Sequence, residues 1–235
     1  MVIGNGLLAK TFDIYKTDNR FLVFASGVSD STNTDKNAFD REKQLLTKCL
    51  VDHSEKVFVY FSTCSIYDAV LSKSPYVLHK LKMENLVSDL HNHYYIFRIS
   101  NLAGHSDNAH TVLNFFVRHI MSGTSFSLWD NASRNIIDVK DAYSICNAIL
   151  QEDRMYNTVI NIANPVNNNV IEIVQEIEKV LRKKGNYKLI ESFSHPEIDV
   201  SAIQSRISSL NINFESNYLK SILNKYYAPD DIQTG

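Results

Sequence analysis

The feature that most constrains the fold of this chain is an alternation of short apolar runs with longer amphipathic stretches. Runs such as Tyr94–Ile99 have the length and composition of buried strands, whereas stretches such as Val170–Lys183 carry apolar residues at helical spacing. Strands and helices that alternate in this way favour a parallel sheet with helices on both of its faces. The sequence therefore predicts an α/β fold.

The alternation extends over most of the 235 residues. The expected strands are Val2–Ile3, Arg20–Ala25, Lys56–Ser62, Tyr94–Ile99 and Thr158–Ala163. The expected helices are a stretch that ends near Tyr15, then Asp35–Val51, Pro75–Leu90, Thr111–Met121, Asp141–Gln151, Val170–Lys183 and Tyr218–Tyr226. The segments 104–133 and 164 onward lie outside the central alternation.

Thr63, Tyr76 and Lys80 are the candidate catalytic residues. Tyr76 and Lys80 lie four residues apart on one face of an expected helix, and Thr63 ends an expected apolar strand. A phenol beside a fixed cation should have a lowered pKa, and a nearby hydroxyl can help to hold a substrate oxygen. Such a trio suits proton transfer to or from an alcohol or ketone while a hydride moves elsewhere. The same spacing also arises by chance in a chain with twelve tyrosines.

A glycine motif follows the first expected strand directly. Gly4-Asn5-Gly6-Leu7-Leu8-Ala9 has the form G-x-G-x-x-A and opens the first expected helix. In this context the glycines let the backbone approach a pyrophosphate, and the start of the helix supplies free NH groups. The motif therefore predicts a dinucleotide site, and its alternative is an ordinary tight turn between strand and helix.

Further motifs follow in a fixed order along the chain. Phe24-Ala25-Ser26-Gly27 is a strand end of small residues, and Ser62 to Tyr67 has the form S-S/T-x-x-V-Y with Ile66 at the valine. Ser74 to Lys80 resembles S-P-Y-x-x-S-K with His79 in place of the usual serine. Arg98 to Gly104 matches R-x-x-N-x-x-G, and Arg134 to Asp141 resembles R-D-F-I-H-V-x-D. Together, from Met1 to about Ser201, they resemble the extended short-chain dehydrogenase/reductase family, the NAD-dependent epimerase/dehydratase type that acts on nucleotide sugars.

The resemblance implies a Rossmann-like parallel sheet with a small substrate-binding lobe. Residues 1–104 and 134–163 would form the dinucleotide-binding domain and residues 105–133 and 164–227 the lobe. Apart from the resemblance, we expect the terminal residues 228–235 to be a disordered tail. NAD or NADP would be the cofactor. The implied cofactor-binding residues are Gly4, Asn5, Gly6, Leu7, Leu8, Ala25, Ser26, Gly27, Ser62, Lys80 and Ile99. The implied substrate-binding residues are Ser65, Asn101, Leu128, Trp129 and Arg134.

The chain departs from this family near its start. The family places two more strands and a helix between the first helix and the Phe24–Gly27 segment, and here only Lys16–Arg20 separates them. The missing strand–helix–strand unit normally carries the acidic residue that binds the adenosine ribose. Asp30 lies at about the right distance from the glycines, but it follows the Phe24–Gly27 segment. We therefore expect Val2–Ile3 at or near a sheet edge.

The resemblance implies an NAD(P)-dependent reductase or epimerase acting on a nucleotide-linked sugar. Tyr76 would be the general acid and base. Lys80 would keep Tyr76 near its phenolate form and contact the nicotinamide ribose, and Thr63 would share the hydrogen bond to the substrate oxygen. A dehydratase is disfavoured, because Cys64 and Ser65 replace the acidic pair that such enzymes carry after the threonine. The alternative is a non-catalytic nucleotide-sugar binding or regulatory protein on a degenerate dehydrogenase fold.

For the binding residues the alternatives are structural. Arg134 offers a fork of donors for phosphate oxygens but is also suited to a surface salt bridge. Trp129 could stack on a base or belong to the core.

Composition excludes several other classes. A net charge of −2 gives no basic footprint for nucleic acid, and no apolar run approaches the length of a membrane span. The three cysteines are scattered, and no His or Cys spacing suggests zinc. The N-terminus enters structure at once, so we expect no signal peptide and a cytoplasmic location. A homodimer is a possible assembly, since a partner chain could cover the exposed sheet edge.

Overall fold

The centre of the protein is a parallel sheet of five strands in the order β1-β2-β3-β4-β8. The computed structural model describes residues 1–152 and 156–229. The strands are β1 (Val2–Ile3), β2 (Phe21–Phe24), β3 (Val57–Thr63), β4 (Tyr94–Ile99) and β8 (Thr158–Ile162). Each lies within one or two residues of the strand expected from the sequence, so the predicted α/β fold is confirmed.

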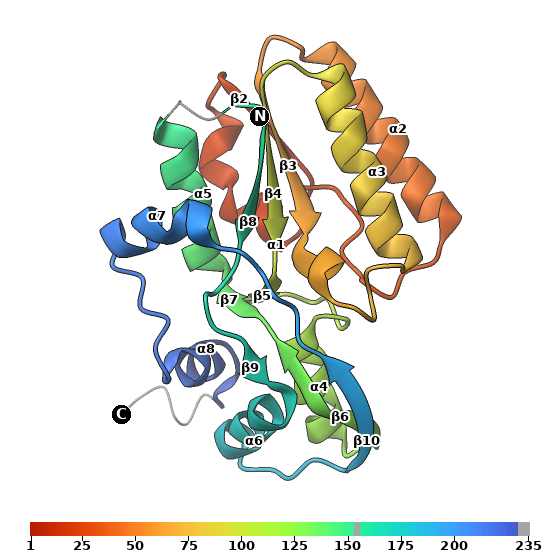
Figure 1. Ribbon diagram of the computed structural model, residues 1–235, viewed down its shortest axis with the longest axis vertical. Helices are drawn as coiled ribbons and strands as arrows, with labels where there is room; N and C mark the ends of the chain where they lie inside the picture. Colours follow the sequence, from red (N-terminus) through yellow and green to blue (C-terminus); the bar gives the residue numbers. More distant parts are fainter. Residues whose placement is uncertain (153–155, 230–235) are drawn as a thin grey trace.

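Helices cover both faces of this sheet (Figure 1). One face packs against α2 (Lys36–Asp52) and α3 (Pro75–Leu90), and the other packs against α1 (Leu7–Thr11) and α5 (Val139–Glu152). On β2, Leu22 and Phe24 belong to the first core, and Phe21 and Val23 to the second. A strand covered on both faces is apolar throughout, which explains the unbroken run Phe21–Phe24.

Strand β1 lies at the edge of the sheet, as the shortened sequence predicts. It pairs only with β2, and no further strand flanks it within the described part of the chain. The amino group of Met1 donates to the carbonyl oxygens of Tyr15 and Phe21 at 2.7 and 2.8 Å. Helix α1 ends at Thr11, and the rest of the expected helix is a 3₁₀ turn over Asp13–Lys16.

A second lobe lies below the sheet in Figure 1. It holds β6 (Phe126–Arg134) between β10 (Tyr187–Ser194) and the short β9 (Asn168–Asn169), with α4 (Val112–Ser122), α6 (Val170–Leu181) and α8 (Tyr218–Tyr227). Their apolar faces share one core, which includes Leu128, Ile173 and Leu223. The pair β5 (Asn101–Ala103) and β7 (Ile136–Asp138) links the lobe to the sheet.

The domain division expected from the sequence needs two corrections. The 3₁₀ turn Ser201–Ile203 and α7 (Gln204–Ser209) were expected in the lobe, but Ile203 and Ile207 are buried in the core of the sheet. Apolar side chains at these positions complete the sheet face beside α5. The expected tail 228–235 begins too early, because Ala228 packs against the lobe, and residues 230–235 lie outside the described residues.

Helix lengths and hydropathy identify no membrane span in residues 1–152 and 156–229.

Candidate active site

A cavity of about 560 Å³ opens where the carboxyl ends of the strands face the lobe. Asn5, Ala25, Thr63 and Ser100 reach it from the ends of β1, β2, β3 and β4, and Trp129 reaches it from β6 of the lobe. Ligand sites of open parallel sheets lie outside the carboxyl ends of the strands. The fold therefore assembles one site from motifs that are spread along the sequence.

The turn after β1 requires glycine at its first position. Gly4 has a φ of +129°, and a Cβ atom there would lie 2.3 Å from the carbonyl oxygen of Ala25. Gly6 precedes α1, and a Cβ atom there would meet nothing within 4 Å. Gly4 therefore allows β1 and β2 to approach closely, and Gly6 leaves open space on the cavity wall.

Thr63 and Tyr76 meet in the cavity, although they come from different elements. Thr63 ends β3 and donates to the Ser65 hydroxyl at 2.9 Å, while the Ser65 amide donates back to Thr63 at 3.0 Å. Tyr76 stands in the first turn of α3, which Ser74 caps by accepting from the Val77 amide at 3.2 Å. The cap and Pro75 fix the start of the helix and with it the direction of the phenol.

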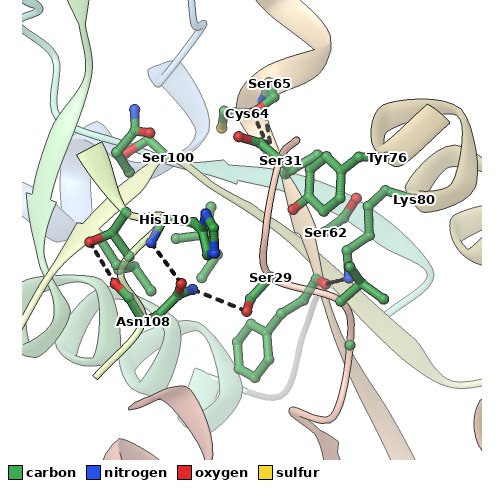
Figure 2. A pocket seen from close by; sticks show the side chains of 18 of the residues that line it. Ser29, Ser31, Ser62, Cys64, Ser65, Tyr76, Lys80, Ser100, Asn108 and His110 are labelled. Atoms are coloured by element: carbon green, nitrogen blue, oxygen red, sulfur yellow. Dashed lines mark hydrogen bonds between the residues drawn. The ribbon is translucent and has the colours of Figure 1, made fainter. Parts of the chain in front are cut away.

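The phenol of Tyr76 does not have the lowered pKa that the sequence predicts. Burial raises its pKa, and hydrogen bonding with Thr63 opposes that effect only in part. The negative charge of Glu42 raises the pKa further. Lys80 does lie one helical turn from Tyr76, as expected (Figure 2), but a cation lowers a phenol pKa only to the extent that its charge is not offset by another group.

The ammonium of Lys80 is engaged elsewhere. It donates to Glu42 Oε1 at 3.1 Å, to the Tyr60 hydroxyl at 3.1 Å and to the Phe61 carbonyl at 3.3 Å. Lys80 is only 3% exposed, and Glu42 is fully buried. Glu42 therefore sits beside the predicted trio and offsets the positive charge of Lys80.

Glu42 is a site residue that the sequence analysis missed. Its carboxylate accepts from the Val28 amide and the Tyr60 hydroxyl at 2.7 and 2.8 Å, and it pairs with His79 at 3.0 Å and Lys80 at 3.1 Å. Desolvation would raise its pKa, but Lys80 and these hydrogen bonds outweigh it and lower the pKa to about 2. The available signal was its place on α2, because Glu42 shares the buried stripe of Leu46, Cys49 and Leu50.

At the lobe side of the cavity, Arg134 bridges the two parts of the protein. Its guanidinium lies over the Trp129 ring at 4.9 Å, donates to the Ser194 hydroxyl at 2.9 Å and is 3.5 Å from Asp68. Ser194 donates to the same Asp68 carboxylate at 2.8 Å. Arg134 thus makes an ion pair, but a largely buried one rather than the surface salt bridge of the structural alternative, and it also lines the cavity.

The structure brings together most of the residues that the sequence singled out. Those that line the cavity are Asn5, Gly6, Leu7, Leu8, Ala25, Ser26, Gly27, Ser62, Thr63, Ser65, Tyr76, Lys80, Ile99, Asn101, Trp129 and Arg134. Gly4 does not line the cavity, because it packs against the backbone of Ala25 at the end of β2. Leu128 does not reach the cavity, because it is fully buried in the core of the lobe and alternates with Trp129 along β6.

The cavity wall also holds polar residues that no motif predicted. Ser29 accepts a hydrogen bond from Asn108 at 3.3 Å, which connects the loop after β2 with the loop before α4 (Figure 2). Ser100 lines the same cavity, and its buried hydroxyl has no partner among the described residues. No group of three or more His, Cys, Asp or Glu side chains within the described ranges could hold a metal ion.

The parallel sheet, the glycine turn and the cavity at the strand ends define an α/β protein of the Rossmann-like class. The sequence profile of the NAD dependent epimerase/dehydratase family matches residues 5–163. The chain belongs to this family. A search of curated proteins gave no match.

Solved structures of similar fold include three nucleotide-sugar enzymes. UDP-glucuronic acid 4-epimerase from Bacillus cereus, in complex with UDP-glucuronic acid and NAD, has a TM-score of 0.70 at 16% identity over 91% of this chain and 76% of that chain. UDP-glucose 4-epimerase from Thermus thermophilus has a TM-score of 0.65 at 14% identity, over 91% of this chain and 78% of that chain. dTDP-glucose 4,6-dehydratase from Bacillus anthracis str. Ames has a TM-score of 0.64 at 16% identity, over 92% of this chain and 76% of that chain. The Thermus and Bacillus anthracis structures are also complexes with NAD. The present chain is shorter than these neighbours.

Proposed function

We propose that this protein is an NAD-dependent reductase or epimerase that acts on a nucleotide-linked sugar. The observation that carries the proposal is the convergence of the Gly4–Gly6 turn with the hydroxyls of Thr63 and Tyr76 on one cavity. A binding module would need the turn but not a buried phenol held beside a second hydroxyl. Family membership and the NAD complexes of the structural neighbours support the choice of cofactor.

The residues present fit the pyrophosphate and nicotinamide parts of such a cofactor. Gly6 faces open space, and the wall continues past Ala25–Gly27. The Ser100 hydroxyl has no partner in the part of the chain that the structure describes, so it is available to a polar group that enters the cavity. The adenosine half has less to hold it, because β1 ends the sheet and the acidic ribose ligand of the missing unit has no counterpart there. We expect the adenosine to remain largely exposed to solvent.

The chain's own residues would handle the proton and the orientation of the sugar. When bound, NAD supplies the hydride acceptor, and NADH the donor, at the sugar carbinol or ketone carbon. Tyr76 holds its proton at neutral pH because burial raises its pKa, so it can protonate a ketone oxygen as reduction proceeds. Thr63 shares the hydrogen bond to that oxygen. Both side chains are buried, although both line the cavity.

The lobe side suits the nucleotide part of the substrate. Arg134 can exchange its contact with Asp68 for diphosphate oxygens, since phosphate also accepts from the guanidinium fork. Trp129 offers a ring face, although Arg134 now covers one side of it. Asn101, Ser65 and Arg134 would then contact the substrate, and Leu128 would not.

A panel of UDP- and dTDP-linked sugars tests the proposal. The purified protein would be incubated with each sugar and with NAD or NADH, while NADH absorbance and the NMR spectrum of the sugar are followed. The proposal predicts an epimer or a change of oxidation state with at least one sugar, and a loss of that reaction in Tyr76→Phe. No reaction with any sugar, together with measurable sugar binding, would favour a non-catalytic binding protein. The incomplete adenosine site is the observation that favours this second candidate.

A further inference from the structure

Beyond the residues in direct reach of a substrate, the cavity rests on a buried cluster of charges that connects α2 and α3. Within the described residues, the Lys80 ammonium donates to Glu42, to the Tyr60 hydroxyl and to the Phe61 carbonyl, and Tyr76 is not among its partners. A free ammonium at this position could swing toward the phenol one helical turn away. Its present contacts hold it on β3 instead.

The carboxylate of Glu42 is fully satisfied in this arrangement. Oε1 accepts from Tyr60 and Lys80, whereas Oε2 accepts from the Val28 amide and pairs with His79. Two donors at each oxygen fix the orientation of the carboxylate, and burial strengthens its attraction for the ammonium. Stacking of His79 on Phe39, with ring centroids 4.5 Å apart, fixes the imidazole as well.

The backbone at Gly27 approaches the ion pair closely. A Cβ atom at Gly27 would lie 2.5 Å from Lys80 Nζ and 2.9 Å from Glu42 Oε1. Gly27 therefore faces the ion pair directly, and the absence of a side chain lets Lys80 and Glu42 meet beneath the loop that lines the cavity. The loop, β3, α2 and α3 all contribute to one fixed geometry.

We propose that Glu42 is a positioning residue that binds Lys80 and withholds its positive charge from the hydroxyl of Tyr76. The proposal rests on the proposed function in one respect only, the role of Tyr76 as acid and base. Its physical content is that Lys80 stabilises a Tyr76 phenolate weakly while Glu42 is charged. The contact between Glu42 and Lys80 would then help to keep Tyr76 in its protonated form, even though the tyrosine and the lysine have the spacing that would otherwise favour the phenolate.

Other titratable groups also face this cluster. Besides burial, which is the largest cause, Glu42, Asp30 and Cys64 each raise the pKa of Tyr76, and Glu84 is among the groups that raise the pKa of Tyr60. Glu84 is itself paired with Arg98 at 2.6 Å, and His79 faces Glu42 from α3. Apart from the Tyr60 hydroxyl, Glu42 is the only one of these groups that contacts Lys80.

The test is a titration of the Tyr76 position in the free protein. 3,5-Difluorotyrosine incorporated at position 76 titrates at lower pH than tyrosine, and its ¹⁹F signal reports the ionisation without cofactor or turnover. In Glu42→Gln we expect the acid dissociation constant of this phenol to rise about tenfold or more, because one buried negative charge is lost and Lys80 is released. Glu84→Gln is the matched control, since it neutralises a buried carboxylate that does not contact Lys80, and it should change the constant little.

A second pair of variants separates a role through Lys80 from a direct effect of charge. In a Lys80→Met background, Glu42→Gln should raise the constant clearly less than it does when Lys80 is present. Equal effects in the two backgrounds, or no effect of Glu42→Gln at all, would overturn the proposal. If Glu42→Gln fails to fold, Glu42→Asp replaces it, and a smaller shift in the same direction is expected because the ion pair is lengthened; no shift there would equally overturn it. Failure of the sugar panel alone would leave these titrations unaffected.

Discussion

At the scale of single residues, the cavity depends on groups whose chemistry is set by burial. The sequence suffices to predict Thr63, Tyr76 and Lys80 because their motif lies within eighteen residues of chain. It does not suffice for Glu42, whose partners Tyr60 and Lys80 are 18 and 38 residues away. The lowered pKa expected for Tyr76 is wrong for a related reason: its spacing to Lys80 is right, but burial raises the pKa of the phenol and the distant Glu42 raises it further.

Tyr76→Phe should leave the fold intact and remove most of the turnover. The substitution deletes one hydroxyl, and general acid–base catalysis contributes ~10²–10⁴-fold. The measurement is kcat with the sugar found in the panel, with circular dichroism as the check on folding. Turnover within a few-fold of the unaltered protein would remove Tyr76 from the mechanism.

Arg134→Ala should raise KM for the nucleotide sugar far more than it weakens cofactor binding. Loss of a charge-assisted contact costs ~1.5–3 kcal/mol, or roughly 10- to 100-fold in affinity. Arg118→Ala is the control, because Arg118 is exposed on α4 and does not line the cavity. A loss of cofactor affinity with an unchanged KM for the nucleotide sugar would show that Arg134 contacts the cofactor instead of the sugar.

At the scale of elements, the central strands and helices follow from local pattern, and the lobe strands do not. Helix α3 begins and ends where Ser74-Pro75 and the apolar spacing predict. Strand β10 is mostly exposed, and its parallel partner β6 lies some sixty residues earlier, as in the pairing of Tyr187 with Phe126. Such a strand lacks the apolar run or the alternation that identifies strands in a sequence, so tertiary pairing alone creates it.

The turn between β1 and α1 gives a paired prediction for stability. Gly4→Ala should lower the free energy of unfolding by ~1–3 kcal/mol or more, because the residue has a positive φ and its Cβ would lie 2.3 Å from a backbone oxygen. Gly6→Ala should leave stability nearly unchanged, since its Cβ meets nothing within 4 Å. Urea denaturation of both variants makes the comparison. Equal stability of the two would contradict the geometry of the turn.

The packing of α2 on α3 should depend on pH through Glu42. Its folded-state pKa of about 2 lies below the ordinary value of 4.5, so its contribution to stability is complete above pH 4.5 and is lost as the pH falls through 2. The shift corresponds to roughly 3 kcal/mol. The difference in unfolding free energy between the unaltered protein and Glu42→Gln should therefore be largest at neutral pH and shrink in acid. A difference that does not change with pH would show that Glu42 is not charged in the fold.

At the scale of the whole molecule, the protein has the fold of its family but lacks the strand–helix–strand unit that would extend the sheet beyond β1. The glycine turn and the cavity floor remain, and β1 has become an edge strand. This loss was readable from the sequence, because only Lys16–Arg20 separates the first helix from the next strand. The position of residues 201–209 against the sheet was not, since no motif distinguishes a segment that packs on the domain from one that packs on the lobe.

The central claim is that the chain keeps the nicotinamide half of a dinucleotide site and has lost the adenosine half. Titration calorimetry of the purified protein with NADH and with NADPH tests it most directly. The account predicts weak binding of both with little discrimination, because the segment that reads the ribose 2′-position is missing. Tight binding of one with strong rejection of the other would contradict the account and would mean that another segment or a second subunit rebuilds the pocket. Binding of neither, even with a nucleotide sugar present, would contradict it from the other side and favour a non-catalytic protein.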